Sequence, residues 1–275
     1  MTSGPAVTVV EPRRGWISID WRELWQSREL LYFLVHRDVS VRYKQTILGV
    51  AWAVIQPLTS MLLFTLIFGR LAAIPSDGHP YAVFVFAGLL PWTFFSSAVT
   101  GAAQSLVSQQ ALLTKIYLPR LFVPASALGS ALVDFAVSLV VLAALMAYYR
   151  IVPPAAIVLL PLVVVVLAMA ALGVGLSLAA LTVSYRDFRF IVPFLLQIWL
   201  FVSPVIYPTS FVPERWRWAL SLNPMTGVIE AFRACLLGSP ADAVTLALSG
   251  LSAVALLLYG LFYFRQTERR FADIA

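Results

Sequence analysis

The sequence predicts an all-α integral membrane protein with six transmembrane helices, an N-terminal amphipathic interfacial helix and a re-entrant helical pair before the last span. Five stretches of more than twenty residues contain no Asp, Glu, Lys or Arg, and a sixth is broken only by Asp134. A helix needs about 20 apolar residues to cross a bilayer core of roughly 30 Å. The composition agrees, because 61% of the residues are hydrophobic and 12% are charged, against about 25% charged in soluble domains. Lipid offers the backbone no hydrogen-bond partners, and these runs are too long for barrel strands, so the spanning elements are predicted to be helices.

The first element is a polar arm, residues 1–44, which is predicted to be cytosolic and to end in an amphipathic helix. Its apolar residues cluster on one face at about 100° per residue. They are Trp21, Leu24, Trp25, Leu31, Tyr32, Val35 and Val39. Trp and Arg side chains on such a helix suit the bilayer surface, which favours a position in the cytosolic interface. The alternative is a solvated helix that packs on a soluble partner.

The transmembrane domain follows as residues 45–264, and residues 265–275 form a cytosolic tail. The predicted spans cover residues 47–68, 81–105, 121–148, 155–182, 190–207 and 243–264. Asp134 lies near the middle of the third span, about 13 residues of 1.5 Å rise from its start. An ionisable residue at that depth is a functional candidate by default. The alternative is a structural hydrogen bond to Ser130, Ser138 or another helix.

A short cytosolic stretch of about residues 112–120 connects the second and third spans. It combines apolar and basic residues before a proline, so it suits a groove in a soluble partner and would move as a rigid unit. The residues predicted to couple to a partner are Thr114, Lys115, Ile116, Tyr117, Leu118, Pro119 and Arg120. The alternative is an ordinary loop whose basic residues only fix the orientation of the chain.

The outer segment of about residues 208–238 is too apolar for a free loop, and its two helical patterns are too short to span. Asn223 is a predicted N-cap, Pro224 a first helical residue and Gly238 a stop. Glu230 and Arg233 lie one turn apart and are able to pair. Backbone that does not span is tolerated at membrane depth only inside protein or beside a wet cavity. A re-entrant helical pair that lines an exit is therefore predicted.

Aromatic residues are numerous enough to line a conduit, although most serve packing and interfacial belts. Aromatic planes pack on C–H faces, so such a lining would let a ligand slide without tight binding. The candidates for channel lining are Trp52, Trp92, Phe94, Phe95, Trp199 and Tyr207, with Gln197 adding hydrogen bonds.

The charge distribution sets the predicted topology. Fourteen of the 19 Lys and Arg residues fall on segments that are inside if the N-terminus is cytosolic. This is the asymmetry that the positive-inside rule expects, and it places both termini in the cytosol. The net charge of +6 therefore reflects topology, and a nucleic-acid partner is not predicted.

The chain lacks the residues that several other functions need. Cys235 is the single cysteine, and His36 and His79 fall on opposite sides of the membrane, so no disulfide or metal site is predicted. Neither Lys44 nor Lys115 follows a glycine, so there is no phosphate-binding loop. No cluster of Asp, Glu or His at one membrane face could perform acid–base catalysis. We predict no catalytic residues, and any ATP must be bound by another subunit.

Three motifs together carry a resemblance to a known family. The segment from Arg37 to Gly49, reading RDVSVRYKQTILG and followed by Trp52 and Pro57, resembles the entry motif of the membrane subunit of bacterial ATP-binding-cassette polysaccharide exporters. That family exports O-antigen, capsule and teichoic acid chains. The stretch LLTKIYLPR (residues 112–120), between spans two and three, resembles its coupling helix. The pair Asn223-Pro224, followed by Glu230 and Arg233, resembles its outer re-entrant region. The likeness covers roughly residues 20–265.

The resemblance implies export of a lipid-diphosphate-linked polysaccharide across the bacterial inner membrane. It implies a second copy of the chain, two copies of a cytosolic ATPase that binds ATP and Mg²⁺, and contact with membrane lipids. No cofactor is expected in this chain. The predicted substrate-entry residues, which would attract the diphosphate through charge-assisted bonds, are Arg37, Arg42, Tyr43 and Lys44. The competing explanation is anchoring to anionic lipid, worth about 1 kcal/mol per basic residue.

Two other functions stay open from the sequence. One is a related permease that expels small amphipathic drugs or lipids, which would need no wide aromatic conduit. The other is a membrane glycosyl- or acyltransferase, against which the missing acid–base cluster argues.

Overall fold

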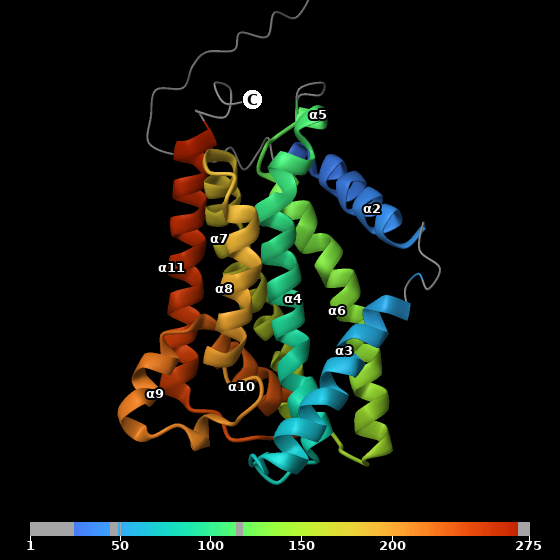
Figure 1. Cartoon of the computed structure of the whole chain (residues 1–275), viewed down its shortest axis with the longest axis vertical. Helices are drawn as coiled ribbons and strands as arrows, with labels where there is room; N and C mark the ends of the chain where they lie inside the picture. The colour runs from blue at the N-terminus through green and yellow to red at the C-terminus, as the bar shows by residue number, and fades with distance from the viewer. Residues whose placement is uncertain (1–24, 45–48, 50, 114–117, 269–275) are drawn as a thin grey trace, which may run out of the picture.

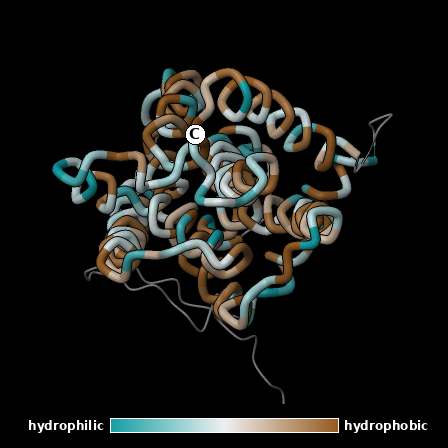
Figure 2. The backbone as a smooth tube through the Cα atoms, turned by 90° about the horizontal axis from the view of Figure 1, so that it is seen from below, coloured by the Kyte–Doolittle hydropathy of each residue, from teal (hydrophilic) through white to brown (hydrophobic). Residues whose placement is uncertain are grey.

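The computed structural model describes residues 25–44, 49, 51–113 and 118–268, and within these ranges the chain is helical without a strand. Five of its helical segments are long and apolar enough to cross a membrane. They are α3 with its π-helical continuation η1 (Ala51–Phe64 and Thr65–Leu71), α4 (Tyr81–Ser108), α6 (Phe122–Tyr148), η2 with α7 (Ala155–Leu159 and Leu160–Ser184) and α11 (Ala243–Glu268). The helices form one elongated bundle (Figure 1). Viewed from below, apolar segments lie all round its periphery (Figure 2), as contact with lipid requires.

The fifth predicted span differs from the prediction. Instead of a helix over 190–207, α8 covers Phe188–Val202, and its 15 residues reach about 22 Å at 1.5 Å per residue. Residues 203–207 continue the segment without a helix, and Ser203, Val205 and Ile206 are buried. Pro204 explains the end of the helix, because its ring has no N–H to continue the hydrogen-bond ladder.

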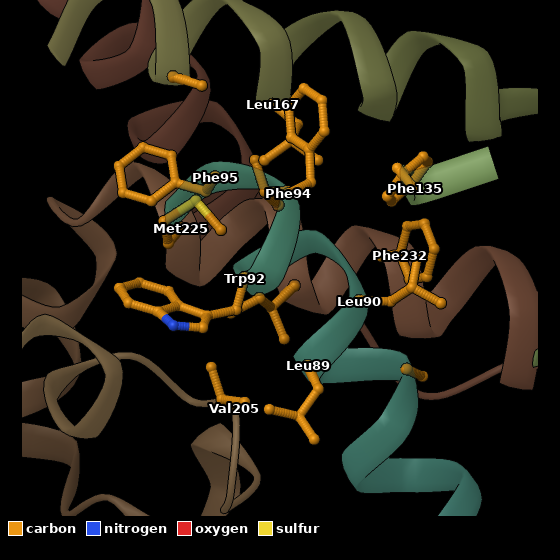
Figure 3. Packing of buried hydrophobic residues seen from close by; sticks show 14 of the residues in the cluster. Leu89, Leu90, Trp92, Phe94, Phe95, Phe135, Leu167, Val205, Met225 and Phe232 are labelled. Carbon is orange, nitrogen blue, oxygen red and sulfur yellow. The ribbon is translucent and has the colours of Figure 1, made fainter. Parts of the chain in front are cut away.

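Helix α4 is the centre of the bundle. In its most apolar stretch 78% of the residues are buried, against 11% in the first candidate span. It contacts α3, α6, α7, α8 and α10. Figure 3 shows Leu89, Trp92 and Phe94 of α4 among side chains from these neighbours, including Phe135 of α6 and Phe232 of α10. A helix that is apolar all round suits this enclosed position.

Small residues allow the closest helix contacts. At the crossing of α7 and α11, a Cβ on Gly260 would lie 2.2 Å from the carbonyl oxygen of Gly173. Between α7 and α4, a Cβ on Gly175 would lie 2.8 Å from the Cβ of Ala102. Glycine at these crossings brings the backbones together, which is a common basis of helix association in membranes.

The N-terminal helix α2 (Arg28–Lys44) runs obliquely beside α6 (Figure 1). Leu34 is its buried residue, and Gly129 of α6 makes room for Val35, whose Cγ2 lies 2.5 Å from where a Cβ would stand. Of the predicted apolar face, Trp25 and Tyr32 are 70% and 73% exposed. The helix therefore uses one side for α6 and leaves aromatic side chains outward.

Two short helices lie at the end of the bundle opposite to α5 (Gln110–Leu113) and the C-terminal end of α11 (Figure 1). After the 3-10 turn η3 (Thr209–Phe211) come α9 (Glu214–Ser221) and α10 (Pro224–Leu237). Helix α10 is almost wholly buried and packs on α4, α7 and α11. The predicted cap is confirmed, because the Asn223 side chain accepts a hydrogen bond from the backbone N–H of Met225 at 3.0 Å. Gly238 ends the helix in the left-handed conformation with a φ of 73°.

Candidate functional site

A groove of about 740 Å³ opens between helices from both halves of the chain, and we call it the interhelical groove. Helices α2, α3, α4, α6 and α8 all contribute lining residues, and α6 contributes a carboxylate. The lining residues are Arg42, Tyr43, Gly49, Trp52, Ala53, Gln56, Trp92, Ser96, Ser97, Thr100, Gly101, Asp134, Pro193, Leu196, Gln197 and Leu200. The groove thus joins a cation, a carboxylate, two indoles and several neutral polar groups.

The charged end of the groove is a three-residue network. The Arg42 guanidinium forms a salt bridge with Asp134, and the Tyr43 hydroxyl donates to the other oxygen of the same carboxylate. Both partners of the salt bridge reach solvent, since the Arg42 and Asp134 side chains are 45% and 23% exposed. Burial, reinforced by the bond to Asp134, raises the pKa of Tyr43 to about 12, so its hydroxyl stays protonated and donates at neutral pH.

The packing of α2 on α6 sets this network. Besides the close approach at Gly129, the Ser126 hydroxyl of α6 donates to Asp38 of α2 at 2.9 Å. One turn further along α2, Arg42 reaches Asp134, which lies two turns beyond Ser126 on α6. The carboxylate at membrane depth is thereby matched with a cation, as such a group requires.

The walls of the groove alternate aromatic and neutral polar groups. Trp52 is 51% exposed and Trp92 is 6% exposed. Hydroxyls of Ser96 and Thr100 and the Gln197 amide lie along the same groove. Hydroxyl and amide groups both donate and accept hydrogen bonds, and indole faces pack on apolar C–H surfaces. This combination suits a ligand with many hydroxyls and C–H faces.

The remaining predicted lining residues lie outside the groove. Phe94 borders an adjoining cavity of about 50 Å³, which shares Trp52 and Asp134 with the groove, and packs edge-to-face on Phe135. Phe95 is fully buried, with ring centroids 5.6 and 5.1 Å from Trp92 and Trp199. The Trp199 indole N–H donates at 3.0 Å to the side-chain oxygen of Asn223, the residue that caps α10. Tyr207 donates to the last carbonyls of α8 at 3.3 Å. Packing and helix-end bonds account for these four residues.

The four predicted entry residues do not all meet. Arg42 and Tyr43 line the groove, whereas the Arg37 guanidinium pairs with its neighbour Asp38 at 2.7 Å. The Lys44 side chain is exposed at the end of α2. Only the first two are therefore placed to contact a ligand in the groove.

The predicted coupling segment is described in part. Its residues Thr114, Lys115, Ile116 and Tyr117 lie outside the described residues. Leu118 is 8% exposed and packs in a small core cluster with residues of α4, α6, α7 and α11, and Pro119 follows it. Arg120 donates to the carbonyl oxygen of Glu268 at 2.8 Å, which joins this segment to the end of α11.

On α10, the ion pair that Glu230 and Arg233 could make is not formed. The Arg233 guanidinium, 3% exposed, instead donates to the carbonyls of Phe84, Pro204 and Val205 at 3.3, 2.8 and 2.7 Å. It also lies 3.6 Å from the centre of the Phe84 ring. Glu230 accepts a hydrogen bond from the Thr209 hydroxyl. Non-helical carbonyls near the end of α8 thus attract the arginine more closely than the carboxylate does.

Several residues that line the groove were not predicted from the sequence. A helical stripe could have found them, because Trp92, Ser96 and Thr100 recur every four residues on α4. Positions 49, 52, 53 and 56 and positions 193, 196, 197 and 200 repeat the same spacing before and within α3 and along α8. Among the described residues no group of three or more His, Cys, Asp or Glu gathers where it could hold a metal ion.

The comparison with protein families decides the class of the chain. A model of the ABC-2 type transporter family matches residues 29–237, which include the whole groove. The chain belongs to the ABC-2 type transporter family. Among the relatives of this ABC-2 transporter, the O-antigen export system permease protein RfbA of Myxococcus xanthus is 35% identical over 215 residues, 78% of this chain and 82% of the relative. An RfbA of Klebsiella pneumoniae is 25% identical over 247 residues, covering 90% and 95%. The polysialic acid transport protein KpsM of Escherichia coli is 26% identical over 237 residues, covering 84% and 91%.

Proposed function

We propose that this ABC-2 transporter is the permease of an exporter that moves a lipid-diphosphate-linked polysaccharide out of the cytosol across the bacterial inner membrane. It would work as a homodimer with two copies of a separate cytosolic ATPase. The single observation that carries the proposal is the interhelical groove, where the Arg42 guanidinium and the Tyr43 hydroxyl lie beside indoles and hydroxyls. The relatives named for O-antigen and polysialic acid transport support the same cargo class.

Six spans fit this role if residues 188–207 cross the membrane as one segment. The 22 Å of α8 fall short of a core of roughly 30 Å, and residues 203–207, which follow as turns and bends, would carry the chain the remaining distance. Non-helical backbone at that depth needs partners within the protein. It has them, because Arg233 donates to the carbonyls of Pro204 and Val205, and Tyr81 donates to that of Ile206 at 2.7 Å. Both termini would then face the cytosol, as the basic residues favour.

The diphosphate would bind at the charged end of the groove. Arg42 offers a guanidinium and Tyr43 a hydroxyl, and both are donors that phosphate oxygens accept. Arg37 and Lys44 would add positive charge nearby, beyond direct contact. The glycan that follows would lie along Trp52, Trp92 and Gln197, where C–H faces and hydroxyls find matching surfaces.

ATP-driven movement would enter through the segment of residues 112–120. Its described part is joined to α11 by Arg120 and to the core by Leu118, so a push on it would reach α4, α7 and α11. At the opposite end, α9 and α10 would form a re-entrant pair beside the exit. The buried position of α10 against α4 supports that arrangement.

The test reverses charge at the proposed entry. In a deletion strain that carries the double variant Arg42→Glu, Lys44→Glu, we expect surface polysaccharide to disappear while the chain still inserts and still co-purifies with its ATPase. Surface glycan is measured by immunoblot and flow cytometry. The matched control is Arg28→Glu, an exposed position at the start of the same helix and outside the groove, which should export normally.

Other results would point elsewhere. Normal export in the double variant would remove the entry site. Drug sensitivity of the deletion strain with unchanged surface glycan would favour a permease for small amphipathic molecules. Turnover of a lipid-linked donor by the purified chain alone would favour a membrane transferase.

A further inference from the structure

We propose that the Asp134 carboxylate serves as an internal anion that occupies Arg42 and Tyr43 and that a lipid diphosphate displaces on binding. This inference rests on the proposed function and adds a regulating residue to the same site. Asp134 belongs to α6, whereas the two donors belong to α2, 91 and 92 residues away in the chain. A contact between elements so distant in the sequence is a feature of the fold rather than of local geometry.

The chemistry of the network matches that of an anion site. A guanidinium and a phenol hydroxyl converge on one carboxylate, and each donates to a different oxygen. Phosphate oxygens accept the same bonds from the same donors. The three side chains line the groove together, so an incoming head group meets Arg42 where the carboxylate already lies.

The exposure of the pair allows an exchange. Arg42 is 45% exposed and Asp134 is 23% exposed, so water and ligand can reach both. Because both partners open onto the groove, packing does not seal the pair and a ligand can separate it. A diphosphate brings more negative charge and more acceptor oxygens than a carboxylate, and it would therefore take over the guanidinium.

The internal anion lowers the affinity of every anionic head group by the same factor, because each must first release the donors. The affinity of a phosphodiester lipid, which carries one charge and binds weakly, is then too low for it to occupy the groove. A diphosphate keeps enough affinity to bind. When the head group moves on, Asp134 takes the donors back, which assists release.

The experiment measures binding to the purified full-length chain in nanodiscs of phosphatidylcholine, with farnesyl diphosphate as the probe and farnesol as the uncharged reference. Asp134→Asn removes the internal anion and should tighten farnesyl diphosphate binding on the order of tenfold, the factor expected for one charge-assisted hydrogen bond. Farnesol binding should not change. In the double variant Arg42→Ala, Asp134→Asn the gain should vanish, because the donor is gone.

The matched control is Glu29→Gln, which removes an exposed carboxylate from the first turn of the same helix α2, outside the groove. It should leave the affinity unchanged, and an equal gain there would reduce the effect to general electrostatics and overturn the proposal. Unchanged or weaker binding in Asp134→Asn would also overturn it, since Asp134 would then only position Arg42. Asp134→Ser carries the same prediction if the Asn variant does not fold.

The outcomes separate this inference from the proposed function. If the unmodified chain binds farnesyl diphosphate and Arg42→Ala weakens that binding, the entry site holds, whatever Asp134→Asn does. If the unmodified chain and Arg42→Ala bind the probe equally, the entry site fails and the internal anion fails with it.

Discussion

Arg233 offers the sharpest test of how this fold tolerates a buried charge. Its guanidinium is 3% exposed and donates to carbonyls of Phe84, Pro204 and Val205. Gly88 makes room for it, since a Cβ there would lie 2.5 Å from Nη2. The perturbation is Arg233→Met, which keeps an unbranched side chain of similar length and removes every donor.

The expected loss follows from the carbonyls that remain. Phe84 lies inside α4, so its carbonyl keeps its helical partner. The carbonyls of Pro204 and Val205 lie outside a helix and would lose the N–H groups of Arg233. Each orphaned buried acceptor costs about 1–3 kcal/mol, or about 2–6 kcal/mol for both. Relief of the desolvation of the guanidinium works in the opposite direction, so the lower part of that range, about 2–4 kcal/mol, is expected.

The assay is thermal unfolding of the detergent-solubilised chain, followed by fluorescence-detected gel filtration after heating. On the scale known for soluble domains of this size, the loss corresponds to a midpoint lower by roughly 4–16 °C. The control is Arg215→Met on α9, an exposed arginine whose removal should leave the midpoint unchanged. If Arg233→Met melts within about 2 °C of the unmodified chain, the carbonyls have other donors and the reasoning fails.

Three further predictions concern other parts of the bundle. Gly260→Ala should destabilise the chain by about 1–3 kcal/mol or more through overpacking against α7, whereas Gly250→Ala on the same helix, with nothing within 4 Å, should be neutral in the same melting assay. Asp242 accepts from the backbone N–H and hydroxyl of Thr245, and these bonds hold the pKa of the carboxylate below its usual range. Its contribution is therefore present at neutral pH and lost on acidification, so Asp242→Ala should lower the midpoint at pH 7 and cease to matter well below about pH 4. Trp199→Phe should cost about 1 kcal/mol by removing the hydrogen bond to the α10 cap, and equal midpoints would show that this bond adds nothing.

Most of the fold follows from patterns that act locally. A charge-free run has few alternatives to a spanning helix, and five of the six predicted runs coincide with helices long enough to cross a membrane. The cap of α10 was equally predictable, because Asn223, Pro224 and Gly238 each act on their own backbone. The end of α8 was predictable only in part, because Pro204 breaks a helix while the run stays apolar past residue 202. The donors for the freed carbonyls come from Arg233, which is distant in the sequence.

The site was predictable only in its residue types. Arg42, Trp52, Trp92 and Gln197 could be selected as a cation, aromatic groups and an amide of the expected chemistry. Which of the aromatic residues face the groove depends on the rotation of each helix in the bundle, and composition does not encode that rotation. Phe95 is therefore as good a candidate from the sequence as Trp92, yet its side chain is fully buried and does not line the groove.

Arg233 and Arg42 differ in exposure, and this difference separates an arginine that stabilises the fold from one that a ligand can reach. Arg233 is sealed among backbone carbonyls, which are fixed in place and leave no route for a ligand to compete. Arg42 has a side-chain partner, Asp134, and both open onto a groove large enough for a head group. A carboxylate on a side chain can rotate away, whereas a carbonyl in a packed segment cannot. Arg233 therefore stabilises the fold, whereas the pair of Arg42 and Asp134 is the one that we propose binds and releases an anionic cargo.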